Sequence, residues 1–123
     1  MAQQTRIIGK RILLVEDDPG ARASIKLLLA IDRHAVVEAT GGAEALELLQ
    51  SQPFDLVILD YFMPGMRGSQ VALHIRQRAP SLPMLMITAY LEKLGDSDKP
   101  VDAVLGKPFA IEELRRAIAN LLS

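Results

Sequence analysis

Acidic, hydroxyl and basic side chains stand at the ends of several short apolar runs, and together they suit chemistry at phosphorus. Glu16 and Asp17 follow the first run, Asp60 follows the third, Thr88 ends the fourth and Lys107 stands just after the fifth. Mg²⁺ prefers oxygen ligands such as carboxylates, and an aspartate beside this metal is a competent nucleophile that forms an aspartyl phosphate. A lysine supplies a compact positive charge for phosphoryl oxygens, and a threonine hydroxyl can donate a hydrogen bond to one of them.

Each acidic residue also has a structural explanation when it is taken alone. Glu16 and Asp17 could be solvated loop acids, and Asp60 could support a turn through its own side chain. Asp18 precedes Pro19, and an aspartate N-cap followed by proline is a typical helix start, so we assign Asp18 to helix capping. The joint pattern over four strand ends is what favours a functional site.

The elements that must position these residues alternate between strand and helix. The expected strands cover residues 11–15, 34–39, 56–59, 83–88 and 103–105. The expected helices cover residues 19–30, 42–50, 69–78 and 111–122. In the first helix, helical spacing predicts an inward face of Ala23, Leu27 and Ala30, widened by Ile25, Leu28 and Leu29. Ser69 is the expected N-cap of the third helix.

This alternation predicts one doubly wound α/β domain with a five-stranded parallel sheet and helices on both faces. In such sheets, sites form outside the carboxyl ends of the strands, which is where the polar residues stand. The segment 91–101 contains Gly95, Pro100 and several charges. Any fourth helix in that segment is therefore expected to be short or irregular.

Composition narrows the classes of function. The chain has 123 residues, which suits one domain, and no cysteine, so disulfides and thiolate metal sites are excluded. A net charge of −1 gives no electrostatic footprint for direct binding of nucleic acid. No apolar run approaches the ~20 residues of a membrane span, and no signal-peptide pattern is visible, so a cytoplasmic location is expected. Met1–Gly9 reads as a flexible polar lead-in.

The strand-end motifs resemble those of a known family. LLVEDD at 13–18, LVILDYFMPGMRG at 56–68, MITA at 86–89 and GKPF at 106–109 are similar to the response-regulator receiver domain of two-component signalling. The resemblance runs from about Lys10 to Leu122, nearly the whole chain, and predicts a receiver domain over 10–123. It implies the flavodoxin-like, chemotaxis-regulator-like form of the doubly wound fold.

The resemblance also implies a role for each matching residue. Asp60 resembles the phosphoacceptor. Asp17 resembles the acid that binds Mg²⁺ directly, Glu16 its partner, and the backbone carbonyl of Phe62 a further ligand. Thr88 and Lys107 resemble the switch hydroxyl and the lysine that contact the phosphoryl group. The bond between Lys107 and Pro108 is often cis in such domains.

Two departures from the family pattern affect how a signal leaves the site. Receivers usually carry an aromatic residue three positions before the lysine, where this chain has Val104. The stretch between Thr88 and Lys107 is shorter than the family's by roughly one helical turn. We therefore expect either altered coupling to the output face or a face remodelled around Tyr90 and Leu91. The resemblance also implies that Phe62 and Tyr90 occupy the two positions that flank the path of hydrolytic water. Both residues are bulky, which predicts slow autodephosphorylation.

The expected partners follow from the resemblance. The phosphoryl donor would be a histidine kinase or a phosphotransfer protein, and the target or output domain is unidentified. The chain would be a switch rather than a turnover enzyme, either stand-alone or a piece of a larger regulator, with a homodimer through the last helix as a further option. An Asp-nucleophile phosphatase would need a second acid where Phe62 stands. A phosphorylation-independent interaction module is the main alternative, supported by Val104 and the short segment 91–101.

Overall fold

Five parallel strands form one sheet in the order β2-β1-β3-β4-β5. The computed structural model describes residues 6–89 and 100–123. The strands are β1 Arg11–Val15, β2 Ala35–Ala39, β3 Leu56–Asp60, β4 Met84–Thr88 and β5 Ala103–Gly106. The helices are α1 Pro19–Ile31, α2 Gly42–Ser51, α3 Gly68–Arg78 and α4 Ile111–Leu122. The predicted doubly wound fold is confirmed.

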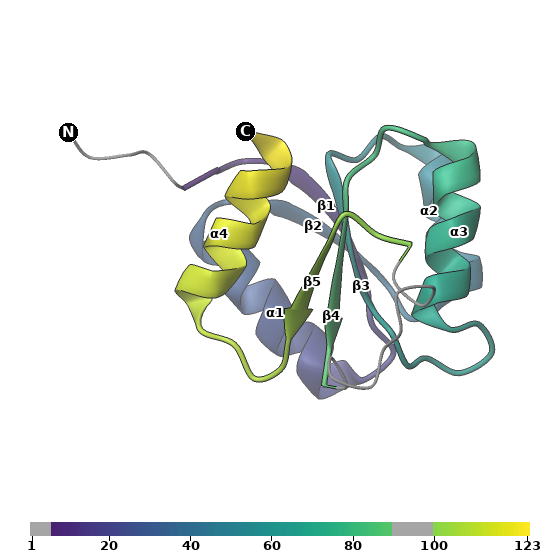
Figure 1. Ribbon diagram of the computed structural model, residues 1–123, viewed down its shortest axis with the longest axis horizontal. Helices are drawn as coiled ribbons and strands as arrows, with labels where there is room; N and C mark the ends of the chain where they lie inside the picture. The colour runs from purple at the N-terminus through teal and green to yellow at the C-terminus, as the bar shows by residue number, and fades with distance from the viewer. Residues whose placement is uncertain (1–5, 90–99) are drawn as a thin grey trace.

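The helices cover the two faces of the sheet in pairs. α1 and α4 lie on one face, and α2 and α3 lie on the other (Figure 1). Alternate residues of the central strands supply the two cores. Leu13, Val57 and Leu59 pack with the α2/α3 side, whereas Ile12 and Ile58 pack with the α1/α4 side. Because β1, β3 and β4 are buried on both faces, their sequences are continuously apolar rather than alternating.

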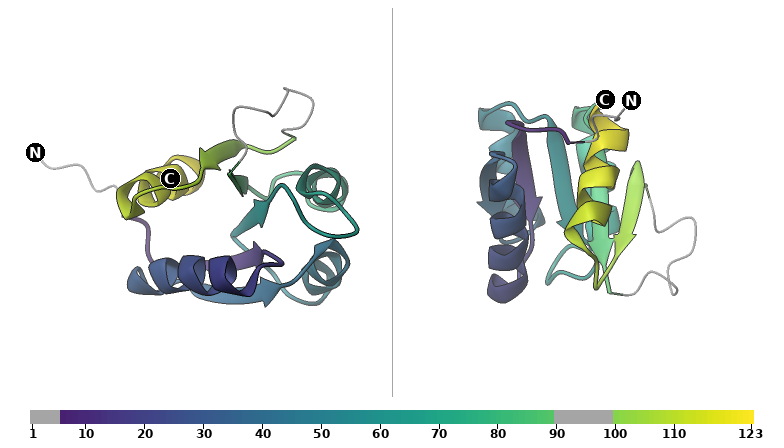
Figure 2. Two further views of the ribbon diagram at one scale, coloured as in Figure 1. Left: turned by 90° about the horizontal axis from the view of Figure 1, so that it is seen from below. Right: turned by 90° about the vertical axis from the view of Figure 1, so that its left-hand side faces the viewer.

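The parallel arrangement places the carboxyl ends of all five strands at one edge of the sheet, which the two views of Figure 2 let the reader follow. β1 occupies the position between β2 and β3, and β4 lies between β3 and β5. The chain therefore reverses its direction of winding after β2. The loops that follow β1 and β3 meet at this switch point, which is where doubly wound sheets build their sites.

The inward face of α1 differs from the prediction. Ile25 and Leu29 are buried, at 4% and 1% exposed, while Leu27 is 69% exposed. Ala23 and Ala30 are exposed as well. The sequence of α1 offers two overlapping apolar stripes, and packing against the sheet selects the stripe that contains Ile25 and Leu29. The stripe of Ala23, Leu27 and Ala30 was wrong as the core face, although Leu28 is partly buried against the core.

The start of α3 also differs from the prediction. Ser69 is not the N-cap: α3 begins at Gly68 with Arg67 as its N-cap. The side chain of Gln70 accepts a hydrogen bond from the Arg67 backbone N–H at 2.9 Å. The Gly68 N–H donates to the carbonyl of Tyr61 at 2.7 Å. The cap formed by Gln70 and the contact with Tyr61, the residue after β3, together fix where the helix begins.

Other expectations concern the ends of the fold. Two residues of the predicted lead-in contact the rest of the domain. Arg6 forms an ion pair with Asp32 at 2.7 Å, and the Gly9 N–H donates to the Asp32 carbonyl at 3.1 Å. The Lys107–Pro108 peptide is cis, as expected. The predicted short fourth helix and Tyr90 lie outside the described residues, as does the start of the lead-in. Within 6–89 and 100–123, no helix is long and apolar enough to cross a membrane.

Candidate functional site

The structure brings the predicted carboxylates together. Glu16 and Asp17 follow β1, and Asp60 is the last residue of the neighbouring strand β3. One carboxylate oxygen from each of the three residues lies within 4.8 Å of the others. Three hard oxygen donors on two adjacent strand ends fit Mg²⁺, which takes a few carboxylates and keeps several waters. This is the one group of potential metal-binding side chains within the described part of the chain.

Lys107 stands between two of these acids. Its Nζ lies 3.3 Å from Oε1 of Glu16 and 3.4 Å from Oδ2 of Asp60. Burial opposes the charge of Lys107, but the negative charges of Asp60 and Glu16 outweigh burial and raise its pKa. The lysine therefore remains charged at neutral pH. Both distances are long for charge-assisted hydrogen bonds, so the ammonium is shared between the acids rather than committed to one.

Glu16 is the more constrained acid. Its side chain is 2% exposed, and burial, followed by the charge of Asp60, raises its pKa. Oε2 of Glu16 accepts a hydrogen bond from the Asp18 backbone N–H at 3.2 Å, while Oε1 faces Lys107. Both oxygens therefore have partners, which compensates part of the cost of burying a carboxylate.

The backbone around Asp60 is packed tightly. Oδ1 of Asp60 accepts a hydrogen bond from the Tyr61 N–H at 2.7 Å, which turns Oδ2 toward Lys107. A Cβ atom on Gly68 would lie 2.1 Å from the carbonyl oxygen of Asp60. Such a contact is impossible without movement of the backbone. The first turn of α3 can therefore pack this closely against Asp60 only because position 68 is glycine.

Thr88 and Lys107 are connected through the main chain. Thr88 is fully buried and pairs with Gly106 across β4 and β5. The Lys107 N–H donates to the Thr88 carbonyl at 2.8 Å. Asp60 pairs with Ile87 on the other side of β4. Asp60, Thr88 and Lys107 therefore lie at the same edge of the sheet. Val104 pairs with Met86, two residues before the pair of Thr88 and Gly106.

Two residues next to the clustered acids in sequence have side chains that make other contacts. Asp18 caps α1 as predicted, since its Oδ2 accepts from the Ala21 N–H at 2.8 Å. Phe62 follows Asp60 by two positions and is 45% exposed. Its ring meets the buried ring of Tyr61 edge-on at 4.6 Å. The role of the Phe62 carbonyl as a metal ligand stays a prediction.

Sequence reasoning missed Arg22. Its Nη1 donates to the carbonyl oxygen of Glu16 at 2.9 Å and lies 3.4 Å from that of Asp17. Its Nε donates to Oε1 of Glu38 on β2 at 3.2 Å. Contacts to main-chain carbonyls follow no side-chain pattern. The only signal available was an arginine in the first turns of the helix that follows the acid pair.

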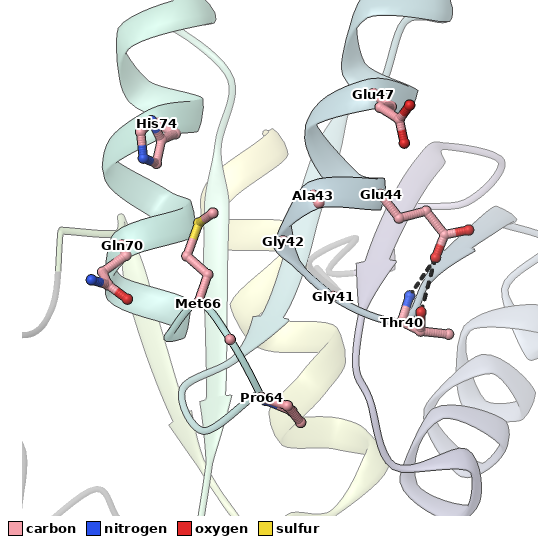
Figure 3. A pocket seen from close by; sticks show the side chains of 11 residues that line it. Thr40, Gly41, Gly42, Ala43, Glu44, Glu47, Pro64, Met66, Gln70 and His74 are labelled. Atoms are coloured by element: carbon pink, nitrogen blue, oxygen red, sulfur yellow. Dashed lines mark hydrogen bonds between the residues drawn. The ribbon is translucent and has the colours of Figure 1, made fainter.

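A separate pocket of about 670 Å³ lies between α2 and the turn that leads into α3 (Figure 3). Its wall includes Met66, Gln70 and His74, and none of the clustered acids lines it. Glu44, on its opposite side, accepts hydrogen bonds from the backbone N–H and the hydroxyl of Thr40. Glu44 therefore stabilises the start of α2, and the pocket is distinct from the carboxylate cluster.

A doubly wound sheet with an acid cluster, a buried threonine and a lysine at one edge defines the receiver class of α/β domains. Residues 12–119 match the family model described as the response regulator receiver domain. The chain belongs to this family, so it is a receiver domain of two-component signalling. Receiver domains are signalling switches.

Individual relatives agree with this assignment. Over 115 residues the chain is 38% identical to the response regulator MprA of Mycolicibacterium vanbaalenii, covering 91% of this chain and 50% of the relative. The chain thus spans about half the length of the curated relatives it matches. It superposes on the response regulator TrrA of Thermotoga maritima, solved in complex with Mg²⁺-BeF, with a TM-score of 0.86, 37% identity and coverage of 92% and 99%. A chain from the complex of histidine kinase ThkA with TrrA gives a TM-score of 0.85 at 36% identity, with coverage of 93% and 99%.

Proposed function

We propose that the chain accepts a phosphoryl group on Asp60 in a Mg²⁺-dependent reaction and that this modification switches its surface. The observation that carries the proposal is the position of Lys107, whose ammonium lies against both Asp60 and Glu16 beside Asp17. A similar receiver, TrrA, has been solved with Mg²⁺-BeF and also in complex with the histidine kinase ThkA. A histidine kinase or phosphotransfer protein is therefore the proposed donor.

The proposed reaction forms a bond between a carboxylate oxygen of Asp60 and phosphorus. The bond from phosphorus to the donor's imidazole nitrogen breaks, and the electron pair stays on that nitrogen. Mg²⁺, when bound, would neutralise the repulsion between the carboxylates and the incoming phosphoryl oxygens. Glu16, Asp17 and Asp60 would hold it, with the Phe62 carbonyl as the further ligand implied by the family. Lys107 would hold a phosphoryl oxygen by charge.

After transfer, Thr88 is the proposed reporter of the modified state. The added group carries about −1.5 to −2 charge and strong acceptor oxygens. If the Thr88 hydroxyl moves to donate a hydrogen bond to one of these oxygens, it would pull on β4. The end of β4 is hydrogen-bonded to Lys107, the residue that follows β5. The effect would reach the surface through the residues after Thr88. The same proposal includes a cytoplasmic location and a downstream protein target or attached output domain. It also includes the option of a homodimer.

Labelling with a small acyl phosphate tests the proposal. The protein is incubated with Mg²⁺ and the donor, and its intact mass is measured. We expect the gain of one phosphoryl group, which requires Mg²⁺ and is lost in Asp60→Asn. Asp18→Asn is a matched control, because the Asp18 side chain caps α1. We expect this variant to be labelled as wild type is. A protein that is never labelled would instead favour an interaction module independent of phosphate, and turnover of an external phosphoester would favour an enzyme.

A further inference from the structure

Arg22 joins three elements around the loop that carries the acid pair. It lies in α1, one turn after the N-cap, and its backbone N–H donates to the Asp18 carbonyl at 2.9 Å. Its guanidinium reaches back over this turn to the carbonyls of Glu16 and Asp17. The same group reaches β2 through Glu38. The side chain is 19% exposed, so most of it is enclosed by what it contacts.

The two carbonyls lie where the backbone needs support. The Glu16 N–H still donates to the Ala39 carbonyl at 3.0 Å, as the strand would. Beyond that point the chain leaves the sheet, and α1 begins only at Pro19. The guanidinium therefore contacts two of the three carbonyls in the connection between strand and helix, residues 16–18. Fixing these peptide planes fixes the directions in which the side chains of Glu16 and Asp17 leave the backbone.

The other end of Arg22 is also held. Glu38 accepts from Nε of Arg22 at 3.2 Å and from Nζ of Lys26 at 2.9 Å. Hydrogen bonds from Lys26, and then from Arg22, lower the pKa of Glu38, so this carboxylate is charged at neutral pH. A planar guanidinium can meet acceptors on two edges at once, which the ammonium of a lysine does less well.

We propose that Arg22 is a positioning residue that holds the carboxylates of Glu16 and Asp17 in the geometry needed to bind Mg²⁺. It acts through their main-chain carbonyls and not through contact with metal or phosphate. This inference rests on the proposed function, since it assumes that the acid cluster is the metal site. Lys107 and the Asp18 N–H hold the far end of the Glu16 side chain, and Arg22 holds its near end.

The sign of the effect distinguishes positioning from simple electrostatics. Arg22 is a cation close to a site for a dication, so by charge alone its removal should strengthen Mg²⁺ binding. If Arg22 positions the ligands, its removal should weaken binding. Loss of an outer partner of metal ligands typically costs about 10-fold to 100-fold in affinity. We expect at least about a 10-fold increase in the Mg²⁺ dissociation constant of Arg22→Ala.

The experiment measures Mg²⁺ binding by the metal alone, using calorimetry and the amide NMR shifts of Asp17 and Asp60, with urea unfolding as a check that each variant is folded. Lys26→Ala is the matched control, because Lys26 also contacts Glu38 but not the two carbonyls. We expect its affinity to stay within about twofold of wild type. Arg22→Lys keeps the charge without the planar fork, and we expect an intermediate loss.

The outcomes separate this inference from the proposed function. Equal or tighter Mg²⁺ binding by folded Arg22→Ala would overturn the positioning role, and so would an equal loss in Lys26→Ala. If Arg22→Ala does not fold, Arg22→Lys decides, and unchanged affinity in that variant overturns the role. If wild type itself binds no Mg²⁺ while all variants fold, the assignment of the acid cluster fails, and the role of Arg22 falls with it.

Discussion

Replacing Gly68 with alanine should destabilise the domain although alanine is the better helix former. Gly68 is the first residue of α3, and its backbone angle is not in the left-handed region, so conformation alone would permit alanine. By propensity, alanine would gain about 0.5–1 kcal/mol over glycine in a helix. The obstacle is steric: the new Cβ would lie 2.1 Å from the Asp60 oxygen, 2.9 Å from its carbonyl carbon and 2.9 Å from Cα of Tyr61.

The magnitude follows from which atoms must move. All three obstructing atoms belong to the backbone of β3 and the residue after it, so no side-chain rotation relieves the contact. To reach an ordinary carbon–oxygen separation, α3 and the end of β3 must separate by more than an ångström. Overpacking of this kind costs about 1–3 kcal/mol, and a backbone clash belongs at the upper end. We expect a loss of about 2–3 kcal/mol in the free energy of unfolding.

Gly20 provides the matched control, because it also lies in the first turn of a helix. A Cβ there would meet only Oδ2 of Asp18 at 3.4 Å, an ordinary contact. Gly20→Ala should therefore be neutral or stabilising by up to about 1 kcal/mol. Urea unfolding followed by circular dichroism measures both variants. A Gly68→Ala protein as stable as Gly20→Ala would refute the steric argument. Labelling of Asp60 should also slow in Gly68→Ala, since the displaced backbone carries the proposed phosphoacceptor.

Two further predictions concern phosphate lifetime and pH. Phe62→Ala combined with Tyr90→Ala should shorten the lifetime of the phosphorylated state, because both rings are expected to shield the phosphoryl group from water. Leu73 is exposed on α3, and Leu73→Ala should leave the lifetime unchanged. A lifetime in the double variant that is as long as or longer than that of wild type contradicts the idea. For His34, burial lowers the pKa below 6.5, so the unfolded chain binds the proton more readily. The free energy of unfolding should therefore fall as pH drops below 6.5 and level off once the pH is below the folded-state pKa. Urea unfolding across this range should show a smaller fall in His34→Gln, and identical pH profiles would exclude His34 as the cause.

The fold and the location of the site were predictable because each rests on a strong local signal. Unbroken apolar runs such as 56–59 indicate strands buried on both faces. Alternation with helices implies parallel strands, and parallel strands carry their terminal residues to one edge. Asp17, Asp60 and Lys107 could therefore be grouped although they are far apart in the sequence. Asp18 was separable from its neighbours because its helix-capping signal is itself local.

The features that could not be predicted are set by contacts between elements. Leu27 and Leu29 are equally apolar, and only docking on the sheet decides that Leu29 is buried and Leu27 exposed. Ser69 is a better N-cap by residue type than Arg67, yet α3 begins at Gly68, which fits closely against Asp60, and Arg67 is its N-cap. Arg22 contacts carbonyl oxygens, and every residue has one, so no sequence pattern indicates that contact.

The contacts around Glu16 explain why the ammonium of Lys107 is shared between Glu16 and Asp60. Glu16 is almost fully buried beside Asp60, and both the burial and that neighbouring charge raise its pKa. Lys107 offsets part of this repulsion, but its ammonium is 3.3–3.4 Å from each acid and bonds neither closely. A lysine held tightly by one carboxylate would have to break that bond before it could contact a phosphoryl oxygen. In the proposed reaction, this loose, divided contact would leave Lys107 able to contact a phosphoryl group on Asp60, while the Asp18 N–H would continue to hold Glu16.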